Sequence, residues 1–364
     1  MCETSKRSNK SKIVAVDFFC GAGGVTKGLL NAGIDVICGI DNDPKIRSTY
    51  ERNNIRPNRK NVEFIKSDIN ELSYESLKKT IQKERYDKLI FVGCAPCQPF
   101  TNINTIKEKR KEEMNYLLRF ADFIDFFKPS FLFVENVPGI TAEKYGGILD
   151  KFKKRIEKLG YHYVDDNINA KKYGIPQNRN RRILIATLEG SISFPEQTHG
   201  KGKSDYISIS KVLEKYNLKP LKAGEMDPND QLHRAANLNK DNLWRIKNTP
   251  KDGGGREIWM KSKPISCFLK HINSYKDVYN RMYWNKPSPT ITTRFNSLSN
   301  GRFGHPVEDR AISLREGALF QTFPIDYKFY GNMSDIAKYI GNAVPIELAK
   351  IFGLHFLKLT NNIG

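Results

Sequence analysis

Short apolar runs alternate along the first half of the chain with segments whose apolar residues recur at helical spacing. Runs of about four to eight β-branched or aromatic residues between turn-forming residues are typical of buried strands. Such runs predict strands at residues 13–19, 35–40, 62–65, 88–93, 131–134 and 182–188. Helical spacing predicts helices at residues 25–31, closed by Gly33, at 115–127, stopped by Pro129, and at 147–159. Strands separated by helices predict an α/β fold with a mostly parallel sheet.

The regular alternation ends near residue 190. Residues 191–290 are rich in Lys, Asn, Ser, Gly and Pro, with isolated aromatic residues, and this composition predicts a smaller, loop-rich domain. Residues 337–359 return to an apolar helical pattern, which we expect to pack back on the first domain. We therefore expect a main domain over residues 1–190, completed by 328–364, and a second domain over 191–327.

Charge points to a polyanionic partner. The chain has 60 Lys and Arg against 40 Asp and Glu, a net charge of +20. Such a balance favours nucleic acid first and an anionic membrane second, and a merely solubilising basic surface stays open as an alternative. We expect no membrane partner, because no apolar stretch approaches the ~20 residues that span a bilayer.

The cysteines and the N-terminus bear on the compartment. Six cysteines are scattered, several of them in apolar runs, which indicates buried reduced thiols. The N-terminus is basic and polar without an apolar core, so we expect no secretory signal and a cytoplasmic protein.

A glycine-rich turn at residues 20–24 follows the first predicted strand, and Asp41 follows the second. This pattern is typical of a nucleoside-binding α/β sheet, in which Asp41 could bind ribose hydroxyls. Asp68, after the third strand, could accept a hydrogen bond from an exocyclic amine. The nicotinamide fingerprint requires a glycine where this sequence has Thr26, which argues against a dehydrogenase. A tight turn that binds no ligand remains the alternative.

Cys97 and Glu135 each follow an apolar run, so both should face the crevice at the carboxyl ends of the strands. Cys97 has three interpretations: an inert core cysteine, a redox partner of Cys94, or a nucleophile beside a carboxyl acid. Residues 98–113 are polar and basic, which predicts a mobile loop suited to closing over a phosphate backbone. We expect no metal, because the sequence has neither a second Cys-x-x-Cys nor paired histidines.

Seven motifs carry a resemblance to a known family. They are DFFCGAGG at residues 17–24, APCQPF at 95–100, ENV at 135–137, QNRNRR at 177–182, WNKPSPTI at 284–291, REGALFQTFP at 315–324 and GNAVP at 341–345. In this order they resemble the bacterial DNA (cytosine-5)-methyltransferases, over nearly the whole chain except about residues 190–280.

The resemblance implies a Rossmann-like, S-adenosylmethionine-dependent catalytic domain and a target recognition domain over residues 191–327. It implies that Cys97 is the nucleophile that adds to carbon 6 of cytosine. Glu135 would contact N3 and the exocyclic amine, and Arg181 with Arg179 would hold the base oxygen and the site geometry. Thr101 would contact a DNA phosphate. The implied S-adenosylmethionine pocket comprises Phe19, Gly21, Ala22, Gly24, Asp41, Asn42, Asp68, Ile69, Pro96, Asn342 and Ala343. The product would be S-adenosylhomocysteine.

Within the second domain, residues 251–256 include three glycines and Arg256, which could enter a groove and bind guanine bidentately. A solvated glycine hinge is an equal alternative. Arg294 and Arg302 could also meet DNA.

The main hypothesis is a monomeric enzyme that methylates a flipped cytosine in a specific double-stranded DNA sequence, as the modification half of a restriction system. A separate restriction endonuclease is expected by family analogy alone. One alternative is a tRNA cytosine-5 methyltransferase. The tRNA branch has a Cys-Phe-Thr triplet where this chain has Cys267-Phe268-Leu269, which argues for DNA. The other alternative is a catalytically inactive nucleic-acid-binding protein.

Overall fold

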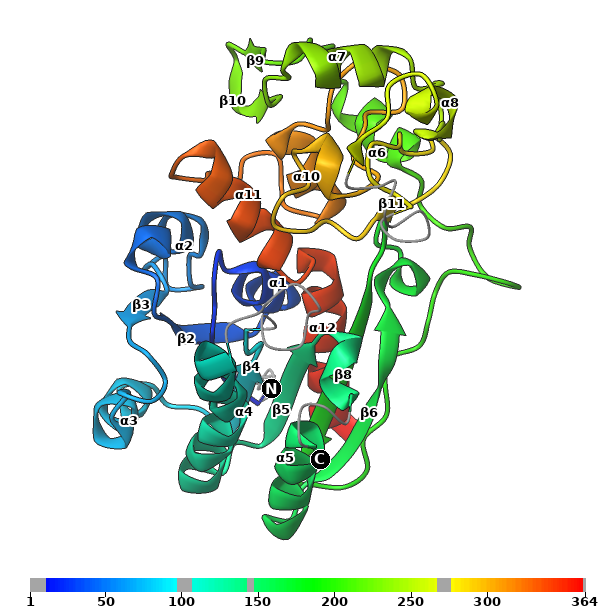
Figure 1. Cartoon of the computed structure of the whole chain (residues 1–364). Helices are drawn as coiled ribbons and strands as arrows, with labels where there is room; N and C mark the ends of the chain where they lie inside the picture. The colour runs from blue at the N-terminus through cyan, green and yellow to red at the C-terminus, as the bar shows by residue number, and fades with distance from the viewer. Residues whose placement is uncertain (1–10, 97–106, 143–146, 267–275, 363–364) are drawn as a thin grey trace, which may run out of the picture.

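The computed structural model describes residues 11–96, 107–142, 147–266 and 276–362. At its centre is a seven-stranded sheet with the order β3-β2-β1-β4-β5-β8-β6 (Figure 1). The strands are β1 (Ile13–Phe18), β2 (Asp35–Asp41), β3 (Glu63–Lys66), β4 (Lys88–Gly93), β5 (Phe131–Asn136), β6 (His162–Asn169) and β8 (Asn180–Thr187). Strands β1 to β5 are parallel, whereas β8 is antiparallel to both β5 and β6. The prediction of an α/β fold with a mostly parallel sheet is confirmed.

Helices cover both faces of the sheet. The helices of this main unit are α1 (Gly24–Ala32), α2 (Arg47–Asn53), α3 (Tyr74–Gln82), α4 (Lys107–Phe127), α5 (Ile148–Lys158) and α12 (Ile346–Asn362). Alternate residues of β1 point to opposite faces, Ala15 toward the core that includes α1 and α12, and Val16 toward the core that includes α3, α4 and α5. Glycine allows α1 and α12 to approach closely, since a Cβ on Gly28 would lie 2.5 Å from that of Ala349.

A smaller unit lies at one end of the sheet (Figure 1). It contains α6 (Ile209–Tyr216), β9 (Met226–Asp227), β10 (Asp230–Arg234), α7 (Lys240–Lys247), α8 (Glu257–Met260) and α10 (Leu314–Phe320), and α11 (Met333–Asn342) leads back to the main unit. The short strands β7 (Gln177–Asn178) and β11 (Ser288–Pro289) pair in parallel and join the two units. The domain boundaries stay a prediction.

Two predicted elements differ from the structure. The predicted basic loop at 98–113 is helical from Lys107 onward, as the start of α4. Its Lys, Arg and Glu residues are good helix formers and place opposite charges three or four positions apart. The predicted single helix at 337–359 is two helices, α11 and α12, because Pro345 lacks the N–H that would continue the first.

By length and composition alone, one stretch of the described residues, Met333–Thr360, could cross a membrane. It comprises α11 and most of α12, which Pro345 separates. Within the fold, 56% of the tested window is buried, as in the core helices of globular proteins.

Candidate active site

The residues proposed from the sequence gather at the carboxyl ends of the parallel strands. Phe19 directly follows β1, Asp41 ends β2, and Asp68 comes two residues after β3. Pro96 comes three residues after β4, and Glu135 is the penultimate residue of β5. Because β1 to β5 are parallel neighbours, these five positions lie together at the carboxyl ends of the strands.

The glycine-rich turn after β1 has an unusual backbone. Phe19 and Gly21 have φ angles of 59° and 51°, in the left-handed region. A Cβ on Gly21 would meet no atom within 4 Å, so this backbone borders open space. The Gly21 N–H donates to Asp41 Oδ2 at 2.9 Å, and the Asp43 N–H donates to Asp41 Oδ1 at 3.0 Å. Burial nevertheless raises the pKa of Asp41 above its ordinary value. The turn is therefore tied to the end of β2.

A buried polar cluster lies at the start of α1, next to the glycine-rich turn. Thr26, in the first turn of α1, donates its hydroxyl to Asp17 Oδ2 at 2.6 Å and lies 2.9 Å from the hydroxyl of Tyr50. Burial raises the pKa of Asp17 to about 7 despite that bond. On the other side of the turn, a Cβ on Gly24 would lie 2.5 Å from the carbonyl oxygen of Val344. Glycine here permits the close approach of the GNAVP motif to the start of α1.

Tyr116 contacts two of the proposed cofactor residues and was not predicted from the sequence. It lies in α4, its hydroxyl donates to Asp68 Oδ2 at 3.2 Å, and its ring centroid lies 5.9 Å from that of Phe19. Ile69 is buried beside this group and its carbonyl accepts a bond from Arg119. No motif marks Tyr116, since its position is set by how α4 crosses the sheet.

Glu135 is the buried carboxylate of the site, with 4% of its surface exposed. Arg181, on β8, places Nε 2.8 Å from Glu135 Oε1, and Arg179 Nη2 lies 4.0 Å from the same oxygen. Strand β8 runs antiparallel to β5, and this pairing brings the arginines of the QNRNRR motif alongside Glu135. An ion pair of this kind can hold a carboxyl in one orientation while the arginine reaches a second polar atom.

Arg179 is buried and connects the two units. Its guanidinium donates to the carbonyl oxygens of Ile291 at 3.2 Å, Gly341 at 3.4 Å and Ala343 at 3.0 Å. Gln177 accepts the Ile291 N–H at 2.9 Å and donates to the side chain of Gln321 at 2.8 Å. The side chains of QNRNRR therefore bind the backbone of the PSPTI and GNAVP motifs, which lie more than a hundred residues further on.

Asn136 holds the strand end that precedes Cys97. Its side-chain amide donates to the carbonyl oxygen of Ala95 at 3.3 Å. This bond joins the ends of β4 and β5 and places Ala95, two residues before Cys97, next to the residue that follows Glu135. Cys97 and Thr101 themselves lie outside the described residues.

Comparison with known proteins identifies the family. The model of the C-5 cytosine-specific DNA methylase family matches residues 13–357. The type II methylase M.HgiDII of Herpetosiphon aurantiacus is 37% identical over 341 residues, 92% of each chain. The type II methyltransferase M1.BsuMI of Bacillus subtilis is 30% identical and covers 94% of this chain and 80% of its own. The chain belongs to the C-5 cytosine-specific DNA methylases.

Solved structures agree on the fold of this methylase. A putative DNA modification methyltransferase from an Escherichia coli prophage has a TM-score of 0.71 at 21% identity and covers 96% of this chain and 99% of its own. The Dnmt2 methyltransferase of Schizosaccharomyces pombe has a TM-score of 0.57 at 17% identity, with coverage of 96% and 99%. The enzyme is thus a DNA (cytosine-5)-methyltransferase with the Rossmann-like fold of that group, and the two bacterial relatives above are named as a type II methylase and a type II methyltransferase.

The pocket suits the nucleoside cofactor on which this methylase family depends. S-adenosylmethionine has ribose hydroxyls, an adenine amine and a flat ring, and the strand ends offer the carboxylates of Asp41 and Asp68 and the partly exposed ring of Phe19. Open space beside Gly21 leaves room for a ligand against the backbone. Asn42 and Asn342 are also solvent-accessible. Among the described residues, no group of three or more His, Cys, Asp or Glu side chains could hold a metal.

The arginines expected to contact DNA differ in their surroundings. Arg294 is exposed, three residues after the Ile291 carbonyl that Arg179 binds. Arg302 is half-buried and pairs with Asp277 at 3.0 Å. Arg256 has 6% of its surface exposed at the start of α8, and this burial favours a structural role over a contact with a base.

Proposed function

We propose that this methylase transfers the methyl group of S-adenosylmethionine to carbon 5 of a cytosine that is flipped out of a specific duplex sequence. The observation that carries the proposal is the buried Glu135–Arg181 pair, which Asn136 holds beside the segment that leads to Cys97. A carboxyl and a guanidinium at this end of the sheet, with a thiol in the sequence that follows β4, are the groups that this reaction needs.

The chemistry assigns a role to each side chain. The Cys97 thiolate adds to carbon 6, and the electron pair of the 5,6 double bond makes carbon 5 nucleophilic toward the sulfonium methyl. Glu135 contacts N3 and the exocyclic amine, so that negative charge does not build up on the ring. General acid catalysis of this kind raises the reaction rate by about 10²–10⁴-fold. Arg181 binds the base oxygen, and Arg179 fixes the surrounding backbone. Loss of the carbon 5 proton to a base or water then returns the electrons that expel Cys97.

The cofactor would lie along the strand ends already described. We assign its pocket to Phe19, Gly21, Ala22, Gly24, Asp41, Asn42, Asp68, Ile69, Pro96, Asn342 and Ala343, with S-adenosylhomocysteine as product and no metal. Asp41 would hold the ribose and Asp68 the adenine amine. Phe19 would pack against the adenine ring.

Duplex DNA would occupy the side of the site that faces the smaller unit. A base inside a duplex is out of reach, and flipping it costs a few kcal/mol, which phosphate contacts must offset. The net charge of +20 suits this task, and Thr101, Arg294 and Arg302 are the proposed contacts. The type II names of two relatives support a modification enzyme with a separately acting restriction endonuclease, and we take the enzyme to be a cytoplasmic monomer.

Trapping on a duplex that contains 5-fluorocytosine tests the proposal. Fluorine at carbon 5 cannot leave as a proton does, so the wild type with S-adenosylmethionine should form a denaturant-resistant adduct. Cys97→Ala should bind DNA but give neither adduct nor product, whereas Cys94→Ala, a matched loss of a nearby thiol, should retain transfer. Turnover by Cys97→Ala would refute the role of that thiol.

Radiolabelled transfer to genomic DNA and to tRNA separates the substrates. We expect label on DNA only. Label on tRNA alone would favour the tRNA alternative, and no label on either would favour an inactive binding protein.

A further inference from the structure

An exposed tyrosine with two cations lies on the smaller unit, just before β11. Tyr283 has 38% of its surface exposed. Lys286 Nζ lies 4.0 Å from the centroid of its ring, and Arg302 Cζ lies 5.2 Å from the same centroid. Cation–π contacts of this kind restrict a flexible lysine to one region of the surface. We call Tyr283, Lys286 and Arg302 the Tyr283 cluster.

The two cations differ in their counter-charges. Arg302 pairs with Asp277 and also donates to the carbonyl oxygens of Gly253 and Arg281. Lys286 is exposed, and no carboxylate in the described part of the chain lies within ion-pair distance of its Nζ. Lys286 is therefore an oriented, exposed positive charge that is free to meet an anion from outside the fold.

The cluster rests on a loop with a fixed backbone. Residues 251–256 include Gly253, at a φ of +87°, where a Cβ would overlap the ring of Tyr283. Asp252 accepts the Trp284 N–H at 2.6 Å and donates its own N–H to the Pro306 carbonyl at 2.9 Å. These contacts hold residues 251–256 in one conformation. The loop therefore supports Tyr283, in contrast to the solvated glycine hinge considered from the sequence.

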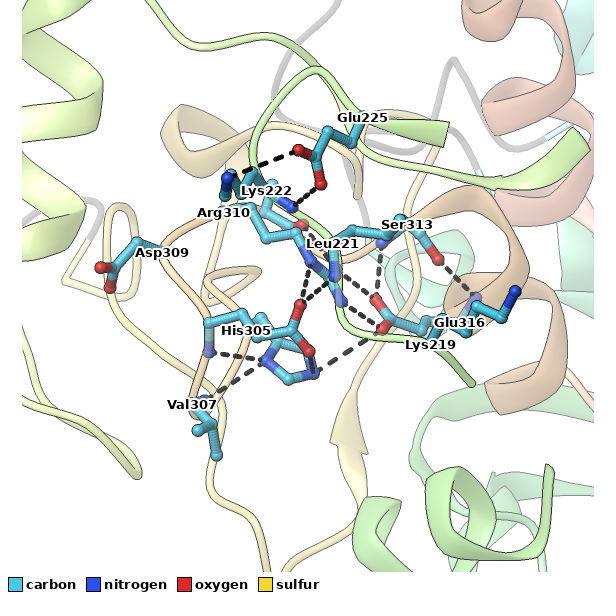
Figure 2. Close-up of polar contacts among 12 residues, drawn as sticks. Lys219, Leu221, Lys222, Glu225, His305, Val307, Asp309, Arg310, Ser313 and Glu316 are labelled. Carbon is cyan, nitrogen blue, oxygen red and sulfur yellow. Dashed lines mark hydrogen bonds and ion pairs between the residues drawn. The ribbon is translucent and has the colours of Figure 1, made fainter. Parts of the chain in front are cut away.

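A buried polar network lies beneath this loop. Arg281 is fully buried and donates to the carbonyl oxygens of Ile246, Thr249, His305 and Glu308, as well as to Asp309. Asp309 also pairs with Lys251, and its neighbour Arg310 binds Glu316 through two bonds of 2.7 and 2.8 Å (Figure 2). The network fixes the loop relative to α10, and α10 packs in the main core.

The cluster is continuous with the active site. Lys286 is two residues before β11, which pairs with β7, and five residues before Ile291, whose carbonyl accepts from Arg179. Five extended residues span at most ~18 Å. Along one DNA strand the phosphates are about 3.4 Å apart per step of the helix axis, so several phosphates beside a base held at Glu135 come within reach of Lys286.

We propose that the Tyr283 cluster is a contact site for the sugar–phosphate backbone of the substrate duplex, with Lys286 as the residue that binds a phosphate and Tyr283 as the residue that positions it. The inference rests on the proposed function, because it takes duplex DNA as the substrate. A cation on a flexible stem binds a phosphate as a point charge and reads no base. The cluster therefore contributes affinity and register without sequence specificity.

Binding of a fluorescent duplex of mixed sequence at several salt concentrations tests this site. Lys286→Ala should weaken binding by about three- to tenfold at low salt and lower the slope of log Kd against log salt by about 1, equally for target and non-target duplexes. Lys286→Arg should restore both values, and Tyr283→Phe should stay near wild type because the ring remains. The matched control is Lys60→Ala, which removes an exposed lysine near the opposite edge of the sheet.

The outcomes separate this inference from the proposed function. One outcome is that Lys286→Ala and Lys60→Ala show the same slope of log Kd against log salt while the wild type methylates genomic DNA. In that case the proposed phosphate site is refuted and the enzyme assignment stands. A loss confined to the target duplex would also overturn it, in favour of base reading. Failure of the wild type to bind or methylate DNA would overturn both.

Discussion

Single side chains at the strand ends decide what this active site can bind. Each carboxylate oxygen of Asp41 accepts one hydrogen bond, from the backbone N–H of Gly21 or of Asp43. Asp41 therefore orders the turn and still has lone pairs that can accept from a ligand. Asp68 likewise receives the hydroxyl of Tyr116 on one oxygen and the Asn70 N–H at 2.8 Å on the other. Both carboxylates are therefore oriented before any ligand arrives, which reduces the entropy cost of binding.

Tyr116→Phe tests this orientation of Asp68. Removing the hydroxyl should raise the KM for S-adenosylmethionine by about two- to tenfold, the value of one lost hydrogen bond of roughly 0.5–1.5 kcal/mol. The KM for DNA should not change. Steady-state kinetics with each substrate varied in turn measure both. Tyr163→Phe is the matched control, because Tyr163 lies on β6 and its hydroxyl donates to the exposed Glu157 of α5. An unchanged cofactor KM in Tyr116→Phe would remove Tyr116 from the pocket.

The sequence predicts those site residues that stand in motifs and misses those that tertiary packing supplies. Glu135, Arg179 and Arg181 could be named because motif and strand end coincide, and the structure does bring these three together. Tyr116 could not, since it lies in the middle of a helix whose pattern reports only burial. The contact between Arg256 and DNA stays a prediction, because a glycine-rich segment with an arginine looks the same in sequence whether the loop is free or held by its neighbours.

At the scale of elements, the sequence predicts buried strands well and polar ones poorly. Strands β1, β4 and β5 each contain a run of at least four apolar residues, and the sequence located them within one or two residues. Strand β6 escaped notice because it is the sheet's edge strand, and its residues are mostly polar and partly exposed. The break between α11 and α12 depends on Pro345 in an otherwise apolar run, where helical spacing alone suggests continuity.

Helix α10 is held by a network that should make the fold sensitive to acid. Ser313 and Glu316 form a capping box at its start, and Arg310 holds the Glu316 carboxylate (Figure 2). His305 Nδ1 accepts the backbone N–H groups of Val307 and Glu308, so the neutral ring fits this place. Burial lowers the pKa of His305 from 6.5 to about 4, although Glu316 and Glu308 oppose the shift and Arg310 and Arg281 assist it.

His305→Asn tests the sign of this effect. A histidine whose pKa is lower in the folded state stabilises the fold fully above its unfolded pKa of 6.5, and this contribution is lost as pH falls toward 4. The wild type should therefore lose roughly 2 kcal/mol of unfolding free energy between pH 7 and pH 5 that His305→Asn does not lose. Asparagine retains an acceptor for the backbone N–H of Val307. Urea unfolding of both proteins at the two pH values measures the difference. Parallel losses would show that His305 does not titrate in this range.

At the scale of the whole molecule, the two units share one core. The main cluster joins sheet residues such as Phe133 and Ile185 to Leu213, Ile291 and Phe320 of the smaller unit. The separate cluster of the smaller unit is small: Ile246, Trp259, Val278, Tyr279, Leu298 and Ala311. Composition suggested a boundary near residue 190, but composition cannot show which apolar residues pack across it. The arrangement suits an enzyme in which the arginines proposed for catalysis and the proposed DNA contacts must keep fixed positions relative to one another.

Cooperative unfolding follows from that shared core. A cluster as small as that of the smaller unit is too little to stabilise an independent domain, because burial must exceed a chain-entropy cost of about 1–2 kcal/mol per residue. We expect one calorimetric transition, with a van't Hoff enthalpy close to the calorimetric enthalpy, although the chain is long enough for two domains. Residues 191–327 expressed alone should lack a cooperative melt, because they would expose Ile291 and Phe320 to water. Two resolved transitions, or a folded fragment, would mean that the smaller unit is stable by itself and that its position on the sheet is free to change when DNA binds.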